Sequence, residues 1–253
     1  MLGLVDARAL AIAAAFLLAC VLAVLVRAAY IVAQSHSDRR PAPPRRSRTD
    51  EATLAIFLGS GGHTAEMMRL VAHLDWTRYS RRRWIISSGD ALSEAKALAL
   101  EKQIGSGQFQ LLKIPRARRV HQSFLTAPFT TLYSLAFCLW HITLAPLLHP
   151  INSGSNRRRV FADLVLLNGP GSCVPITVAA FLPRLLNLPS ASLIYIESLA
   201  RTRRLSLSAQ LVRPLVDRFF VQWESLRDQL VAAEAGSRPS RWKARVECQG
   251  WLV

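Results

Sequence analysis

The chain has 253 residues, 51% of them apolar, and carries 32 Lys and Arg against 16 Asp and Glu, which gives a net charge of +16. This length suits one good-sized domain with an appendage and excludes two full domains. The charge favours an anionic partner, but the basic clusters show no helix-turn-helix, zinc-finger or RNP signature. We therefore expect no nucleic acid and favour a membrane surface. The four cysteines lie far apart without a metal-ligand pattern, so we expect reduced thiols and no metal.

The amino-terminal segment 9–33 is apolar and long enough to cross a hydrocarbon core as a helix. A signal peptide fits less well, because its apolar region is usually shorter and its leading end more basic. Arg27, near the end of the segment, can extend its charge to the headgroups. One Arg precedes the apolar stretch and six lie from Arg27 to Arg48. The positive-inside rule therefore places residues 1–8 in the lumen and the main domain in the cytoplasm.

Residues 34–52 follow this segment and are rich in Pro and Arg, with no apolar period. Such a linker is either an irregular tether along the lipid surface or a plain solvated spacer. Both interpretations stay open.

From Thr53 onward, short apolar runs alternate with stretches of helical spacing such as 63–74 and 91–103. Strands that are apolar on both faces and separated by helices indicate a parallel sheet covered on both sides. The sequence therefore predicts an α/β fold, a doubly wound and mostly parallel sheet within residues 53–253. The expected strands are 53–59, 82–88, 109–114, 162–169, 191–197 and 218–223, with 244–250 as a possible seventh.

A second apolar segment, 124–148, is also long enough to span a membrane but contains two Pro, a His and several Thr. A single second crossing would place the loops that begin at Gly59 and Asn168 on opposite sides of the bilayer. We therefore expect a helix that lies against the domain with one face in the membrane interface. A fully buried core helix is the alternative.

Three polar loops follow expected strands at the edge where a wound sheet binds ligands. They are GSGGHT from Gly59, NGPGSC from Asn168 and ESLART from Glu197. A glycine-rich turn that enters a helix presents backbone N–H groups and the positive end of the helix dipole to an anion. Ser60 and Thr64 add hydroxyl donors. A tight turn without a ligand would use the same residues, so an anion site is the favoured of two interpretations.

The first loop does not fit a nucleotide cofactor. Thr64 occupies the third glycine position of the dinucleotide pattern, and the first acid after the second strand, Asp90, lies too far along the chain. It is not a Walker loop either, because no G-K-[ST] follows. We therefore expect no cofactor.

Two ionisable side chains near these loops are candidates for catalysis. His63 could act as a general base toward a hydroxyl, donate to a phosphate, or face solvent at the start of a helix. Glu197 could bind a sugar hydroxyl, orient a neighbour or form an ordinary ion pair. Cys173 is better interpreted as a small helix-start residue than as a nucleophile, because no acid–base partner lies near it in sequence.

Four stretches of the sequence together form a recognisable set of motifs: LGSGGHTAEM, LLNGPGSCVPI, YIESLARTRRLSLS and DRFFVQW. In order and spacing they resemble the membrane-anchoring subunit of the dolichyl-diphosphate N-acetylglucosamine transferase, protein fourteen of the asparagine-linked glycosylation pathway. The resemblance covers essentially all of residues 54–253.

More distantly, the chain is similar to the amino-terminal half of MurG, the bacterial lipid II N-acetylglucosamine transferase. In that family a G-G-x-G-G-H loop approaches the diphosphate of the acceptor, and Gly59, Gly61, Gly62 and His63 fall on it. Glu197 falls on the Glu of an H-E-Q-N motif, although both of its neighbours depart from that pattern.

The resemblance implies one half of a GT-B glycosyltransferase, with the sugar nucleotide UDP-GlcNAc held mainly by a partner. The implied function is to recruit a small cytosolic catalytic subunit and present dolichyl-diphosphate-GlcNAc at the endoplasmic reticulum membrane, where dolichyl-diphosphate-GlcNAc2 is made for N-glycan synthesis. The chain would be inactive alone. A self-sufficient membrane-bound glycosyltransferase and a pure membrane scaffold are the alternatives.

The implied site residues follow the same motifs. His63 and Glu197 would be catalytic, and the carboxyl-terminal Trp251, Leu252 and Val253 would dock the partner, unless that tail packs on its own domain. The residues expected to bind the acceptor diphosphate are Gly59, Ser60, Gly61, Gly62, Thr64, Asn168, Gly169, Gly171 and Ser172.

Overall fold

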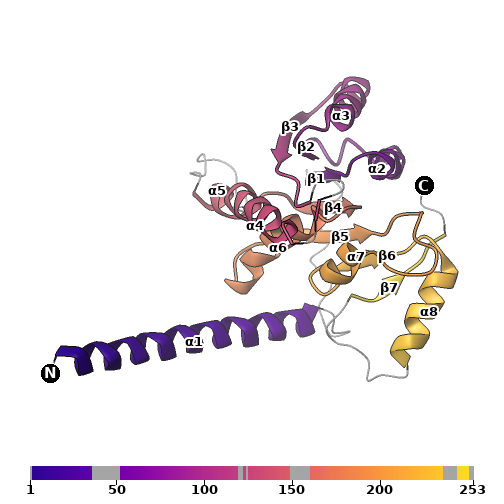
Figure 1. Ribbon diagram of the computed structural model, residues 1–253. Coiled ribbons are helices and arrows are strands. Elements are labelled where there is room, and N and C mark those ends of the chain that lie inside the picture. The colour runs from indigo at the N-terminus through magenta and orange to yellow at the C-terminus, as the bar shows by residue number, and fades with distance from the viewer. Residues whose placement is uncertain are drawn as a thin grey trace.

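The computed structural model describes residues 2–35, 52–118, 122–123, 125–148, 160–235 and 244–250 of the chain. Figure 1 shows a long amino-terminal helix joined to an α/β domain. In chain order the elements are α1 (Leu2–Ser35), β1 (Thr53–Leu58), α2 (Gly62–Val71), β2 (Arg81–Ser87), α3 (Ala91–Ile104), β3 (Gln108–Ile114), α4 (Ala127–Cys138), the π-helix η1 (Leu139–Leu144), α5 (Ala145–Leu148), β4 (Leu164–Asn168), α6 (Cys173–Leu185), β5 (Ser192–Ile196), α7 (Leu207–Val212), β6 (Arg218–Phe220), α8 (Glu224–Ala235) and β7 (Val246–Glu247).

Seven parallel strands form one sheet in the order β3-β2-β1-β4-β5-β6-β7. β1 pairs with β2 on one side, with Phe57 opposite Ile85, and with β4 on the other, with Ala55 opposite Val165. The winding reverses between β1 and β4, which is where such sheets bind ligands beyond the carboxyl ends of their strands. All seven expected strands are present, and the predicted doubly wound parallel sheet is confirmed.

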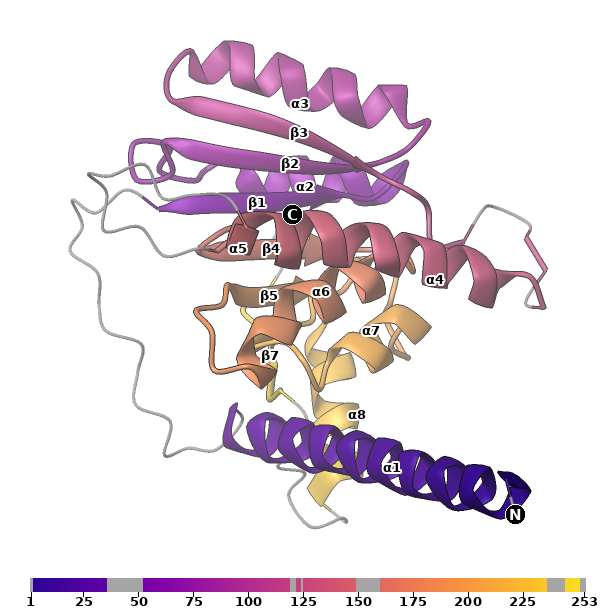
Figure 2. The same ribbon diagram turned by 90° about the vertical axis from the view of Figure 1, so that its left-hand side faces the viewer.

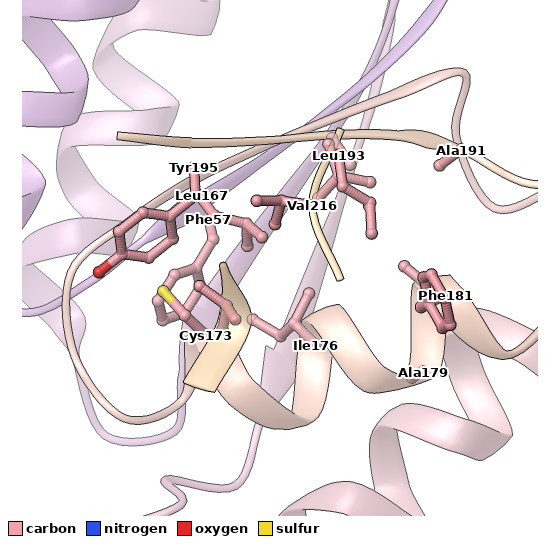
Figure 3. Packing of buried hydrophobic residues seen from close by; sticks show 14 of the residues in the cluster. Phe57, Leu167, Cys173, Ile176, Ala179, Phe181, Ala191, Leu193, Tyr195 and Val216 are labelled. Carbon is pink, nitrogen blue, oxygen red and sulfur yellow. The ribbon is translucent and has the colours of Figure 1, made fainter. Parts of the chain in front are cut away.

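Helices cover both faces of this sheet, and each face has its own hydrophobic core. Figure 2 shows α4, α6 and α7 in front of the strands and α2 behind them. Leu54 and Trp84 belong to the core on the side of α2 and α3. Phe57, Leu167 and Tyr195 belong to the other core and lie near α6 in Figure 3. Because successive side chains of a strand point to opposite faces, strands covered on both sides are continuous apolar runs in the sequence.

The α1 helix contains the expected membrane span, 9–33, which is long and apolar enough to cross a bilayer, and an 18-residue window of it has a mean hydropathy of 3.0. Near its end α1 contacts α6, where Val32 is buried and Arg27 Nε donates a hydrogen bond to the carbonyl of Leu185. Arg27, which we expected to reach lipid headgroups, thus contacts the domain through Nε, and its side chain is exposed. Residues 36–51 of the expected linker lie outside the described residues.

The second apolar segment forms a helix in three parts, α4, η1 and α5, which is also long enough to span a membrane. One side of it packs on α6 and buries Cys138 and Ile142. The other side is open: Phe129 is 74% exposed and Trp140 is 52% exposed. The alternative of a fully buried core helix is therefore wrong. The exposed large side chains along this segment are Leu125, Phe129, Leu132, Tyr133, Trp140, Leu144 and Leu148.

The basic stretch Arg78–Arg83 is not simply a cationic surface for an anionic partner, because part of it is buried. Arg82 is buried and forms a bidentate ion pair with Glu101, with Nε 2.8 Å from Oε1 and Nη2 2.7 Å from Oε2. The guanidinium of Arg83 lies over the ring of Phe161, and burial lowers the pKa of Arg83. A charge buried in such a pair is not available to a lipid headgroup.

Candidate functional site

Three loops meet beyond the carboxyl ends of β1, β4 and β5. The start of α2 is joined to the end of β4 by His63, whose Nδ1 lies 3.0 Å from Oδ1 of Asn168. The segment after β5 is joined to α2 by Ser198, whose hydroxyl donates to Glu66 over 2.8 Å. The convergence expected from the wound sheet is therefore present in the structure.

The start of α2 is open to a ligand. Gly61 is its N-cap, with a φ of 65°, and no side chain among the described residues caps the helix. Gly61 and Gly62 are exposed, and a Cβ placed on either would meet nothing within 4 Å. The first N–H groups of a helix have no partner within it and lie at the positive end of its dipole. An anion can therefore approach these backbone groups directly.

Two other glycines make room for His63. A Cβ at Gly59 would lie 2.6 Å from Pro170 Cδ and 2.8 Å from His63 Cβ. Gly169 has a φ of 114°, and a Cβ there would lie 2.6 Å from His63 Cγ. Both glycines are buried. Their missing side chains let the imidazole lie directly on the β4–α6 loop.

His63 also begins a chain of hydrogen bonds that links all three loops. Its Nδ1 faces Oδ1 of Asn168, and Nδ2 of Asn168 donates to Oε2 of Glu66 over 3.0 Å. The other carboxylate oxygen of Glu66 accepts the hydroxyl of Ser198. Asn168 is fully buried. The side chain of Asn168, which we expected to bind diphosphate, thus forms hydrogen bonds with His63 and Glu66 instead.

Two hydroxyls that we expected near the anion hold the loops instead. Thr64 is buried, and its Oγ1 donates to the carbonyl of Gly59 and lies 2.6 Å from Ser93 Oγ. Ser172 Oγ accepts the N–H of Ala117 over 3.2 Å. The partly or fully exposed residues of the two glycine loops that remain for a ligand are Ser60, Gly61, Gly62, His63, Pro170 and Gly171.

Glu197 is 1% exposed and fastens the segment that follows β5. Its carboxylate accepts the N–H of Ser206 at 2.9 Å, the N–H of Ser198 at 3.0 Å and the hydroxyl of Ser206. Ser206 in turn caps α7 by accepting from the N–H of Ala209. Of the three interpretations of Glu197, these bonds favour the one in which it orients its neighbours.

Cys173 begins α6 and is fully buried. Burial raises the pKa of its thiol well above the usual value, and the negative charge of Glu197 raises it further. A thiol held protonated is a poor nucleophile, in agreement with the interpretation from the sequence. The described ranges contain no group of three or more His, Cys, Asp and Glu side chains that could hold a metal ion.

Sequence reasoning does not single out Glu66 or Ser198. A signal for Glu66 is present, because it lies three residues after His63 on α2, and side chains at that spacing share a helix face. Its partners come from β4 and from the segment after β5, so only the folded sheet shows what that face meets.

The wound parallel sheet and the open, glycine-rich helix start define a Rossmann-like α/β domain with an uncapped glycine loop after β1, attached to a helix that could cross a membrane. A family model described as "Oligosaccharide biosynthesis protein Alg14 like" matches residues 54–237. The chain belongs to this family, and the resemblance read from its motifs is confirmed.

Similar proteins extend over most of the chain. The UDP-N-acetylglucosamine transferase subunit ALG14 of Candida albicans is 43% identical over 222 residues, which are 87% of this chain and 92% of the relative. The proteins of the same name from Cryptococcus neoformans and Rattus norvegicus are 40% identical over 212 residues (82% and 88% of the two chains) and 39% identical over 207 residues (79% and 85%). A solved structure, LpCGTa in complex with UDP, has a TM-score of 0.42 at 17% identity and covers 80% of this chain and 53% of that one.

Proposed function

We propose that this chain is the membrane-anchoring subunit of a two-chain UDP-GlcNAc-dependent N-acetylglucosaminyltransferase. It presents dolichyl-diphosphate-GlcNAc to a cytosolic catalytic subunit, and the product is dolichyl-diphosphate-GlcNAc2. The proposal draws on the Alg14 family, on relatives named as subunits of a UDP-N-acetylglucosamine transferase, and on the motifs of the sequence. The donor UDP-GlcNAc is bound mainly by the partner.

The observation that carries this proposal is the open start of α2 beside His63. Gly61 and Gly62 expose backbone N–H groups with free space above them, as the diphosphate of a lipid-linked sugar requires. His63 lies at the first turn of the same helix, within reach of a group bound there. The acceptor diphosphate would be held by residues 60–63 together with Gly171.

Two apolar features of the chain support an acceptor that is itself anchored in a bilayer. We propose that 9–33 spans the endoplasmic reticulum membrane with residues 1–8 in the lumen. The open apolar side of α4, η1 and α5 would then lie in the interface of the cytosolic leaflet. A helix anchored in the membrane and this apolar surface would together hold the domain at the membrane that contains the acceptor.

The function is tested with the full chain purified together with its cytosolic catalytic subunit. His63→Gln should reduce transfer of N-acetylglucosamine to a dolichyl-diphosphate-GlcNAc analogue by about 10²-fold or more, the usual share of a general acid or base. His73→Gln is the matched control, because His73 is exposed and lies just beyond the far end of α2. If both variants assemble normally and transfer equally well, the chain is a scaffold that takes no part in the active site. Transfer by the chain without its partner would show a self-sufficient enzyme.

The proposed docking of the partner concerns Trp251, Leu252 and Val253, which lie outside the described residues. Deleting these three apolar residues should abolish recovery of the catalytic subunit on affinity purification of the chain. Unchanged recovery would rule out their part in docking.

A further inference from the structure

We propose that Glu66 is a positioning residue that fixes the tautomer of His63 through the side-chain amide of Asn168. The inference rests on the proposed function in one respect, the place of His63 at the acceptor site. The hydrogen bonds themselves belong to the structure. His63 and Glu66 lie on α2 and Asn168 lies on β4, so no single sequence motif contains all three residues.

The carboxylate of Glu66 determines which way the amide of Asn168 points. An ionised carboxylate only accepts hydrogen bonds, and here it accepts from Asn168 Nδ2 at 3.0 Å and from the hydroxyl of Ser198 at 2.8 Å. Turning the amide over would place its oxygen against a carboxylate oxygen. In a fully buried side chain such a pair of acceptors is unfavourable, because no water replaces the lost bond. The amide is therefore held with its oxygen toward His63.

That orientation decides the state of the imidazole. Asn168 Oδ1 is an acceptor, and His63 Nδ1 lies 3.0 Å from it, so Nδ1 carries the proton. In the neutral ring Nε2 then carries the lone pair. Free imidazole side chains in water favour the opposite tautomer, with the proton on Nε2. The site thus imposes the less common form.

This tautomer suits a base better than a phosphate donor. A neutral Nε2 has no proton to offer a phosphate oxygen, but it can accept one from a hydroxyl. In the proposed transfer, the acceptor hydroxyl oxygen bonds to C1 of the donor sugar while its proton passes to Nε2. The bond between C1 and UDP breaks, and UDP leaves with the electron pair. Glu66 would contribute by keeping Nε2 free and not by touching substrate.

The tautomer is read directly by ¹⁵N NMR of the full chain in lipid nanodiscs, labelled on its six histidines. His63→Gln identifies the His63 signals by their loss. In the wild type, Nδ1 should show the shift of a protonated nitrogen and Nε2 that of an unprotonated one. In Glu66→Gln the new amide can donate or accept, so Asn168 is no longer held, and Nε2–H should become the main form.

Matched variants separate this effect from a general disturbance. Glu94→Gln, on α3, removes a carboxylate that pairs with Lys113 and should leave the His63 signals unchanged. The double variant Glu66→Gln with Asn168→Asp places an acceptor-only group opposite Nδ1 again, and the wild-type tautomer should return. A wild-type Nε2–H form, or a Glu66→Gln spectrum identical to the wild type, would overturn the inference.

Kinetics of the complex with its catalytic subunit distinguish this inference from the proposed function. Glu66→Gln should lower kcat by about 10²-fold at most, with little change in KM for the acceptor, and the double variant should recover part of the loss. If the tautomer switches while neither Glu66→Gln nor His63→Gln affects transfer, the positioning by Glu66 stands and the catalytic use of His63 fails. If His63→Gln abolishes transfer and the tautomer does not respond to Glu66, the reverse holds.

Discussion

The imidazole of His63 lies against the backbone of Gly169, so closely that a Cβ at position 169 would come within 2.6 Å of His63 Cγ. Gly169 follows β4 and His63 lies in the first turn of α2, the helix that follows β1, so their contact fixes the distance between these two segments. Glycine is thus required at position 169 for two reasons: its φ is 114°, and a side chain there would displace His63.

Gly169→Ala should therefore push His63 out of place and lower transfer by about 10²-fold, the usual effect of a shift of about 1 Å at a reacting group. Gly105→Ala is the matched control, because Gly105 also has a positive φ, of 65°, but a Cβ there would meet only the carbonyl oxygen of Lys102, at 4.0 Å. Both variants should lose about 1–2 kcal/mol of stability through backbone strain, and Gly169→Ala should lose more because its Cβ also overlaps His63. Equal transfer by the two variants in the purified complex would contradict the role of Gly169.

Glu197→Ala should loosen the segment between β5 and α7. The N–H groups of Ser198 and Ser206 would lose their acceptor, at a cost of about 1–3 kcal/mol for each buried group left unpaired. Trypsin should then cleave within Arg201–Arg204 faster than in the wild type, as followed by mass spectrometry. Glu224→Ala, at an exposed site, is the control. Unchanged protection with a large loss of transfer would instead restore the catalytic interpretation of Glu197.

Trp140 should report contact between the η1 segment and lipid. It is 52% exposed on the open side of that segment. In liposomes, lipids that carry a quencher near the headgroup should quench part of the tryptophan fluorescence of the chain. Trp140→Phe should remove this quenched part. Trp76→Phe, on the other face of the sheet, is the control and should keep it. Stronger quenching by labels near the bilayer centre would show full insertion, and no change in Trp140→Phe would exclude the interface.

Cys173 should resist thiol reagents in the folded chain. Burial raises the pKa of its thiol, so the reactive thiolate does not form at neutral pH, whereas half-buried Cys248 should be alkylated. Since the folded-state pKa is raised, the neutral thiol contributes its full stability below pH 9.0, the ordinary value, and less as the pH rises above it. Peptide mass spectrometry after brief alkylation at neutral pH measures how far Cys173 and Cys248 have each been modified. Modification of Cys173 at the rate of Cys248 would show that α6 opens readily.

Much of the fold was predictable from the sequence, because a strand buried on both faces has to be apolar at every position. Apolar runs such as Leu54–Leu58 identified six strands and 244–250 was a possible seventh, and their alternation with helices indicated a parallel wound sheet. The glycine loop after β1, the apolar length of α1 and the family motifs follow from the sequence in the same way, because each depends on neighbouring residues.

The arrangement within the site depended on contacts between distant segments, and only the tertiary structure decided it. Glu66 meets Asn168 and Ser198 because β1, β4 and β5 lie side by side. The same packing buries Thr64 and Glu197, so side chains that looked suited to a ligand hold loops instead. Residue type and spacing show which groups can donate or accept a proton. Which partner each group meets is set by the order of the strands, and that decided the chemistry left to His63.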